Sequence, residues 1–282
     1  MSTILVPLDE TAFAESILPD AEQLASPGGA IVLVYVVARS SSTSDVERYL
    51  TNEAQLLKAR GFQASTKVLV GGDIPRAIDE GVTGLGAEMV AVATHGSGGR
   101  GRLARGSIAW KTLAHSPVPV VLRHGQEGRV RDLEERSPEP VKIMVPLDGS
   151  ARAEQALALA ARLASQWNGS LLLVQISSDS TGGQEYLDRM AHGSAVPVKT
   201  ALRHGRAGET LAQLGEEFDI THVVMTSHGR TGMSRAIAGD VAADLIERLS
   251  VPIVVVPSLT AESRHNSDGR TVEKTAPAGS LS

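Results

Sequence analysis

The chain contains no cysteine, and aromatic residues make up only 3% of its 282 positions. Without cysteine, the sequence excludes disulfides, thiolate metal sites and cysteine nucleophiles. The absence also fits a reducing cytosol. With so few aromatic residues, the core must be built from Val, Leu, Ile and Ala.

Strong net charge and long apolar runs are also missing. The formal charge of −5 at pH 7 gives no electrostatic reason to expect nucleic acid or an anionic membrane as a partner. No apolar run approaches the roughly 18 residues that suggest a membrane span. Residues 1–7 lack the basic stretch and long apolar run of a signal peptide. We therefore expect a soluble, cytoplasmic protein.

An internal repeat is the most informative feature that is present. The apolar segment at 4–9 ends in Asp9, and it returns at 143–148, ending in Asp148. Four further landmarks recur in order: Ile31–Val34 as Leu171–Val174, Thr94-His95-Gly96 as Ser227-His228-Gly229, Gly106 as Gly239, and Val118–Val121 as Val251–Val254. The distance between equivalents falls from 139 or 140 residues to 133, which one deletion between the second and third strands explains. Two copies of one domain therefore make up the chain.

Each copy alternates short apolar runs with Ala-rich helical segments. In the first copy we expect strands near 2–8, 30–37, 64–70, 88–94 and 118–123, and helices at 11–25, 44–60, 73–85 and 107–115. Near-continuous apolar runs are typical of parallel strands that are covered on both faces. The sequence thus predicts an α/β fold with two tandem doubly wound domains, each a five-stranded parallel sheet (order 3-2-1-4-5) with helices on both faces.

The boundaries follow from composition. We predict a first domain at 1–124, a linker at 125–140, a second domain at 141–258 and a disordered tail at 259–282. The fifth strands are apolar, and each would lie at a sheet edge, where an exposed apolar strand favours pairing. We therefore expect the two copies to form an intramolecular pseudo-dimer across these strands.

The candidate ligand site lies at the carboxyl ends of the strands, where the strand order of an open α/β sheet reverses. Asp9 ends the first strand and Val36 the second, so a base there would meet one hydrogen-bond acceptor and one apolar wall. Thr94-His95-Gly96 follow the fourth strand and open a loop rich in Gly and Arg, at 97–105. Glycine backbone and the next helix N-terminus, at Gly106-Ser107, suit an anion such as a phosphate.

These motifs resemble the universal stress protein family. Its ATP-binding members carry Gly, two residues, Gly, nine residues, then Gly followed by Ser or Thr. The first copy has this spacing, with Ala93 in place of the first glycine, then Gly96, Gly106 and Ser107. The second copy has Thr226 at the first position.

The resemblance implies an adenine-nucleotide site in each copy, for ATP or a related nucleotide with or without Mg²⁺. Adenine would lie at Asp9 and Val36, and ribose and phosphates at Thr94, His95, Gly96, Gly106 and Ser107. The second-copy counterparts are Asp148, Ile176, Gly229 and Gly239. The family also suggests that whole chains form a homodimer.

The second copy departs from the pattern because Asp240 replaces the Ser or Thr. A carboxylate about 4 Å from a phosphate costs roughly 1–4 kcal/mol at effective dielectrics between water and protein surface. We therefore expect the first copy to bind nucleotide better than the second.

Structural roles compete with each of these assignments. Ser107, Asp240, Asp9 and Asp148 are all good helix caps. The histidines before Gly96 and Gly229 can simply fix a turn, and the loop arginines can be solvated. No P-loop, H-E-x-x-H or paired-cysteine pattern is present, so neither P-loop hydrolysis nor a metal enzyme is indicated.

Three functions remain open at this point. The first is a nucleotide-binding stress or regulatory protein, which is not an enzyme beyond slow ATP hydrolysis. The second is a nucleotide-free interaction module in which the loops are remnants. The third is an adenylyl-transferring enzyme, although the H-I-G-H and S-G-G-x-D-S motifs of such enzymes are absent.

Overall fold

The computed structural model describes residues 2–25, 28–38, 43–94, 108–124, 140–226 and 240–257. The first copy runs β1 (Thr3–Pro7), α1 (Ala12–Glu15), α2 (Leu18–Ala25), β2 (Ala30–Val37), α3 (Ser44–Ala59), β3 (Gln63–Val70), α4 (Ile74–Leu85), β4 (Met89–Thr94), α5 (Ile108–His115) and β5 (Val120–His124). The second runs β6 (Lys142–Leu147), α6 (Gln155–Gln166), β7 (Ser170–Ile176), α7 (Ser180–Ala191), β8 (Val198–Arg203), α8 (Ala207–Glu217), β9 (His222–Thr226), α9 (Asp240–Arg248) and β10 (Ile253–Val256).

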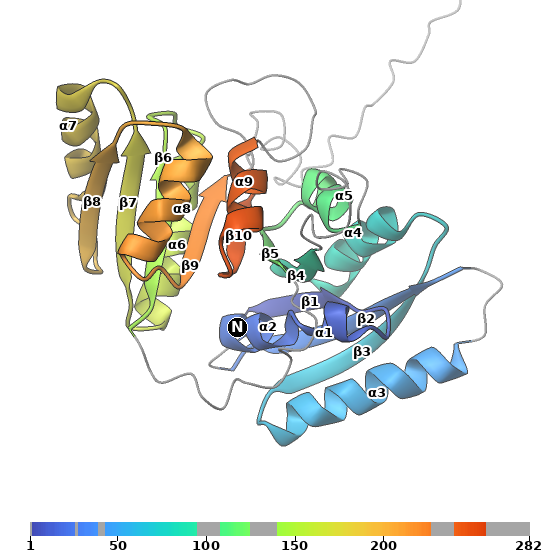
Figure 1. Cartoon of the computed structure of the whole chain (residues 1–282). Coiled ribbons are helices and arrows are strands. Elements are labelled where there is room, and N and C mark those ends of the chain that lie inside the picture. The colour runs from blue at the N-terminus through green and yellow to red at the C-terminus, as the bar shows by residue number, and fades with distance from the viewer. Residues whose placement is uncertain are drawn as a thin grey trace, which may run out of the picture.

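The described strands form one sheet in the order β3-β2-β1-β4-β5-β10-β9-β6-β7-β8. Within each copy the strands pair in parallel, and the order in each half is the predicted 3-2-1-4-5. The two halves meet where β5 and β10 pair antiparallel, with Val121 opposite Val254 (Figure 1). The predicted fold class of two tandem doubly wound domains is therefore confirmed.

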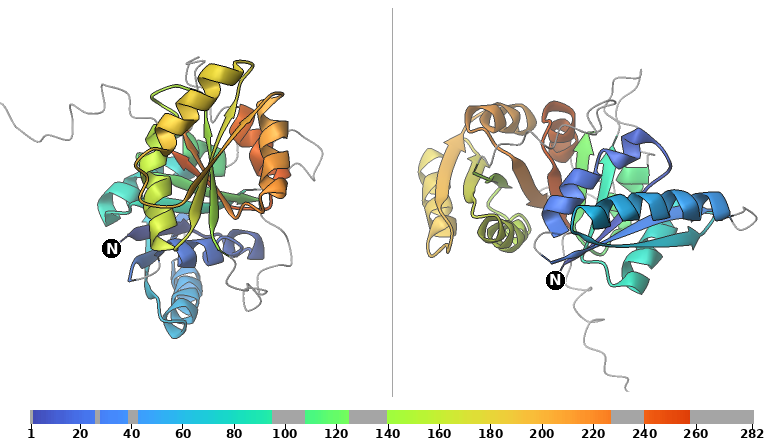
Figure 2. Two further views of the ribbon diagram at one scale, coloured as in Figure 1. Left: turned by 90° about the vertical axis from the view of Figure 1, so that its left-hand side faces the viewer. Right: turned by 90° about the horizontal axis from the view of Figure 1, so that it is seen from below.

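Helices cover both faces of this sheet. In the second copy, α6 and α7 lie on one face, and α8 and α9 on the other (Figure 2, left). One buried apolar cluster holds side chains from α2, α3, α6 and α7, and a second holds side chains from α4, α5, α8 and α9. Each cluster takes residues from both copies, because β5 and β10 make the sheet continuous.

The central strands β4 and β9 are buried along their whole length. This agrees with the near-continuous apolar runs from which covered parallel strands were predicted. Among the described residues, no helix combines the length and the apolar character that crossing a bilayer requires.

The helix predicted at 11–25 is wrong in one respect, because the structure divides it into α1 and α2. Pro19 is the second residue of α2 and has no N–H to donate to the carbonyl of Glu15. At the break, the Ser16 hydroxyl donates to the Phe13 carbonyl oxygen at 2.6 Å. Proline inside the apolar pattern therefore ends the first helix and starts a second.

The predicted domain boundaries stay predictions. Most of the linker and the whole tail fall at 125–139 and 258–282, outside the described residues. Polar contacts between described residues also join the two copies. Trp167 Nε1 donates to the Gln23 carbonyl at 3.2 Å, Arg162 lies 3.7 Å from Glu88, and Arg123 donates to the Ser250 carbonyl at 2.9 Å.

Candidate functional site

A cavity of about 450 Å³ lies at the carboxyl ends of β1, β2 and β4 in the first copy. This is the point where the chain crosses from one side of β1 to the other, since β2 and β4 flank β1. The residues that line it are Pro7, Leu8, Asp9, Phe13, Ala14, Tyr35, Val36, Ile74, Val92, Ala93, Thr94, Ile108 and Ala109.

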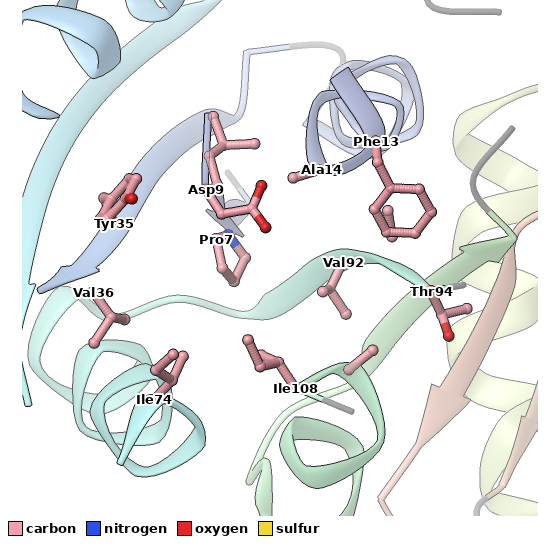
Figure 3. A pocket seen from close by; sticks show the side chains of 13 residues that line it. Pro7, Asp9, Phe13, Ala14, Tyr35, Val36, Ile74, Val92, Thr94 and Ile108 are labelled. Carbon is pink, nitrogen blue, oxygen red and sulfur yellow. The ribbon is translucent and has the colours of Figure 1, made fainter. Parts of the chain in front are cut away.

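Two opposite walls bound the cavity. Figure 3 shows Asp9, Phe13 and Tyr35 on one side, and Val36, Ile74 and Ile108 on the other. Ile74 and Ile108 are the first residues of α4 and α5, and both are unusually exposed for large apolar side chains. The space therefore has the shape of a slot with one mainly apolar wall and one mixed wall.

The Asp9 carboxylate is held by the turn that follows β1. Its Oδ1 accepts from the Thr11 backbone N–H at 3.2 Å and from the Thr11 hydroxyl at 2.5 Å. Thr11 Oγ1 in turn accepts from the Ala14 N–H at 3.1 Å. Thr11, rather than Asp9, therefore caps α1, and Asp9 Oδ2 has no hydrogen-bond partner within the described part of the chain.

Two further polar groups stand at the cavity. Burial raises the pKa of the Tyr35 phenol, and the carboxylates of Glu10 and Asp9 raise it further. The phenol is thus a hydrogen-bond donor at neutral pH. Thr94, at the end of β4, is 2% exposed, and its hydroxyl has no hydrogen-bond partner among the residues that the structure describes.

The structure brings together the predicted residues that it describes in the first copy. Asp9, Val36 and Thr94 all line the cavity. The remaining predicted residues of this copy, His95, Gly96, Gly106 and Ser107, lie outside the described residues. The phosphate end of the predicted site is therefore untested.

Among the lining residues that sequence reasoning did not predict are four large side chains, those of Phe13, Tyr35, Ile74 and Ile108. Two of them had a usable signal. Ile74 and Ile108 begin the helices that follow β3 and the glycine-rich loop, and such helix starts lie at the ligand edge of a doubly wound sheet. Phe13 and Tyr35 had none, because their approach depends on how α1 packs.

The second copy repeats the turn after its first strand. Asp148 Oδ1 accepts from the Ser150 N–H at 3.0 Å, and Ser150 Oγ accepts from the Ala153 N–H at 3.1 Å. Ser150 therefore accepts from the turn that follows it, as Thr11 does in the first copy, although α6 itself begins only at Gln155. Of the other second-copy candidates, the structure describes Ile176, which is the last residue of β7. Gly229 and Gly239 lie outside the described residues.

In the second copy, the end of the second strand packs differently from the same region of the first copy. Gln175 stands at the strand position of Tyr35, and it is 7% exposed. A methyl group at Gly183, in the first turn of α7, would lie 3.1 Å from Gln175 Oε1 and 2.8 Å from Leu202 Cδ1. The β7–α7 connection covers only 177–179, against 38–43 for β2–α3. The shorter connection brings the first turn of α7 down onto the strand end.

The fold and the cavity define a doubly wound α/β protein in tandem form, with a ligand-sized space at the switch point of its first sheet. A model of the universal stress protein family matches residues 1–124 and 183–257, more than half of the chain. The chain therefore belongs to the universal stress protein family.

Individual relatives agree with this assignment. A universal stress protein of Mycobacterium tuberculosis is 29% identical over 191 residues, which cover 60% of this chain. One from Mycolicibacterium smegmatis is 27% identical over 187 residues, again 60% of this chain. The chain spans 61% of the first relative's length and 62% of the second's.

A solved structure shows the shared fold. The universal stress protein of Archaeoglobus fulgidus superposes with a TM-score of 0.70, covering 91% of this chain and 96% of its own, at 18% identity. The tandem architecture is thus common to both proteins.

Proposed function

We propose that the first copy binds an adenine nucleotide, with the base in the cavity beside Asp9. The observation that carries this proposal is the cavity itself. It lies at the switch point, and it is lined by Asp9 and Val36, the two residues that the sequence resemblance assigns to adenine.

The cavity fits a purine on chemical grounds. Its volume of about 450 Å³ falls within the roughly 300–1,000 Å³ of small-molecule sites. The wall formed by Val36, Ile74 and Ile108 suits the flat apolar face of a base. Asp9 Oδ2 offers an acceptor for an exocyclic amino group. Ribose and phosphates, with or without Mg²⁺, would then extend toward Thr94 and the loop after it.

Three observations favour a single site in the first copy. Asp240 replaces the Ser or Thr at the phosphate end. Gln175 and the first turn of α7 pack tightly where Tyr35 stands in the first copy. The family model leaves 125–182 unmatched, and that stretch holds Asp148 and Ile176. The second copy then serves as the partner of the first in an intramolecular pseudo-dimer.

We further propose that the chain is a cytoplasmic regulatory protein of the stress response rather than an efficient enzyme. No group at the described cavity is arranged as a nucleophile with an adjacent base, so turnover would be limited to slow ATP hydrolysis. Nucleotide would act by changing which surfaces the chain presents, including those through which whole chains form homodimers. A nucleotide-free interaction module is the alternative.

The first experiment measures the nucleotide in the purified chain by mass spectrometry and titrates the emptied chain with ATP by calorimetry. We expect a stoichiometry near one per chain. Asp9→Asn should weaken ATP binding by about tenfold, because the amide keeps the acceptor for Thr11 but replaces the free carboxylate oxygen. The matched variant Asp148→Asn should leave affinity unchanged.

Two further variants test whether the first copy binds ATP more tightly than the second. Ser107→Asp should weaken binding, and Asp240→Ser should add a second site. If neither changes the titration, the ranking is wrong. If the purified chain carries no nucleotide and ATP gives no heat up to millimolar concentrations, the interaction module replaces the binding protein as the best account.

A further inference from the structure

Tyr35 lines the cavity, and its ring packs partly against the buried apolar cluster that holds side chains from α2 and α3, but the family motif assigns its hydroxyl no role. It is the last residue but two of β2, and the motif assigns the neighbouring Val36 instead. The Tyr35 hydroxyl has no hydrogen-bond partner among the residues that the structure describes. It lies close enough to Asp9 and Glu10 for both carboxylates to raise its pKa. A phenol in this position is available to a ligand.

The wall that holds Tyr35 also holds the free oxygen of Asp9. Figure 3 shows Tyr35 and Asp9 on the same side of the cavity, facing the apolar side chains of Val36 and Ile74. One group accepts a hydrogen bond and the other donates one. A base lying on the apolar wall would present its edge to both.

We propose that Tyr35 determines base specificity by donating a hydrogen bond to a ring nitrogen of adenine, while Asp9 accepts from the adjacent 6-amino group. This inference rests on the proposed function. Adenine carries the matching pattern, since N1 and N7 both accept and both flank the amino group. Guanine held in the same pose would place an oxygen where the 6-amino group lies, and the Asp9 carboxylate would repel that oxygen.

The second copy supports the assignment by contrast. Its counterpart, Gln175, is turned inward, and a methyl group at Gly149 would lie 3.6 Å from Gln175 Nε2. Gln175 is therefore committed to packing between the Asp148 turn and the first turn of α7. The pair of a tyrosine donor and the free Oδ2 of Asp9 occurs in the first copy, where both side chains line the cavity.

The test uses the full chain, freed of nucleotide, and three ligands: ATP, 7-deaza-ATP and 1-deaza-ATP. Calorimetry compares the wild type with Tyr35→Phe. Tyr186→Phe is the matched control, because it removes the tyrosine hydroxyl of the second copy. Thermal unfolding of each variant checks that the fold is retained.

We expect Tyr35→Phe to weaken ATP binding by about five- to tenfold, the effect of one hydrogen bond. Tyr186→Phe should leave it unchanged. One deaza analogue should bind the wild type as weakly as Tyr35→Phe binds ATP, with no further loss in the variant. That analogue identifies the nitrogen which Tyr35 contacts.

Two results would overturn the assignment. One is equal ATP affinity for the wild type and Tyr35→Phe. The other is a loss in Tyr35→Phe that is the same for ATP and for both analogues, because the hydroxyl would then act away from these nitrogens. A wild type that binds no ATP at all is a different result, since it removes the proposed function itself and this inference with it.

Discussion

At the scale of single residues, the turn after the first strand of each copy requires a left-handed backbone. Gly149 adopts φ +82° in the second copy, and Glu10 adopts φ +66° at the equivalent position. A side chain in this region costs about 1–2 kcal/mol. We expect Gly149→Ala to lower the free energy of unfolding by about 1 kcal/mol, measured by urea denaturation.

The control for this prediction is a glycine that the backbone does not require. Gly84 lies in α4, and a methyl group there would meet no atom within 4 Å. Gly84→Ala should raise the free energy of unfolding by about 0.5–1 kcal/mol, because alanine loses less entropy in a helix. Shifts of the same sign in both variants would contradict the role of backbone conformation.

Asp79 is a carboxylate that the fold accommodates poorly at neutral pH. Burial raises its pKa, Asp73 raises it further, and His115 lowers it. Its Oδ1 is buried without a hydrogen-bond partner in the described part of the chain. A carboxyl group whose pKa is raised by folding stabilises the fold at low pH, and this contribution is lost as the pH rises through the folded pKa.

Asp79→Asn should therefore raise the free energy of unfolding at pH 7. The gain should shrink as the pH falls toward the ordinary range of a carboxyl group, where the wild-type side chain becomes neutral too. Urea denaturation between pH 4 and 8 measures the difference. Glu80→Gln, an exposed neighbour on α4 that pairs with Arg76, is the control and should show little change.

At the scale of elements, one buried ion pair fixes α2 against the end of β5. The Asp20 side chain is 1% exposed and that of Arg123 is 16% exposed. Arg123 Nη2 donates to Asp20 Oδ1 at 2.5 Å, and Nη1 donates to the Ser250 carbonyl at 2.9 Å. The same guanidinium therefore contacts α2 and the segment between α9 and β10.

Asp20→Ala should lower the free energy of unfolding by about 3 kcal/mol, because it leaves Arg123 charged and largely buried. The double variant with Arg123→Met should recover part of that loss, since no buried charge remains. Asp45→Ala, which breaks an exposed pair with Arg48, should change stability by at most about 0.5 kcal/mol. If Asp20→Ala and Asp45→Ala lowered the free energy of unfolding equally, burial of the ion pair would not explain the effect.

The elements themselves were largely predictable, because strand and helix periods are local properties of the sequence. The run at 88–94 gave β4, and the pattern at 44–60 gave α3. The break before α2 was not predicted, although Pro19 lies inside the segment predicted as one helix. Asp9 and Val36 were predictable as site residues, because strand ends in this fold lie together. Tyr35 was not, because its approach to the cavity depends on how α1 packs.

At the scale of the whole molecule, the two copies share one sheet and both apolar clusters. The β5–β10 pairing buries Val121 and Val254 completely. Separation of the copies would expose these strands and break the contact from Trp167 to the Gln23 carbonyl. Each half by itself would therefore expose apolar residues that are buried in the whole chain. This favours cooperative unfolding of the two copies as one unit.

The two tryptophans allow this cooperativity to be measured, since Trp110 lies in α5 of the first copy and Trp167 follows α6 of the second. In Trp167→Phe the fluorescence reports the first copy, and in Trp110→Phe it reports the second. Within each variant, we expect the urea midpoint from fluorescence to coincide with that from far-UV circular dichroism. ATP, bound by the first copy, should then raise the midpoint reported by Trp167 as well. Separate midpoints, or an ATP shift confined to Trp110, would show that the copies unfold independently despite their common sheet.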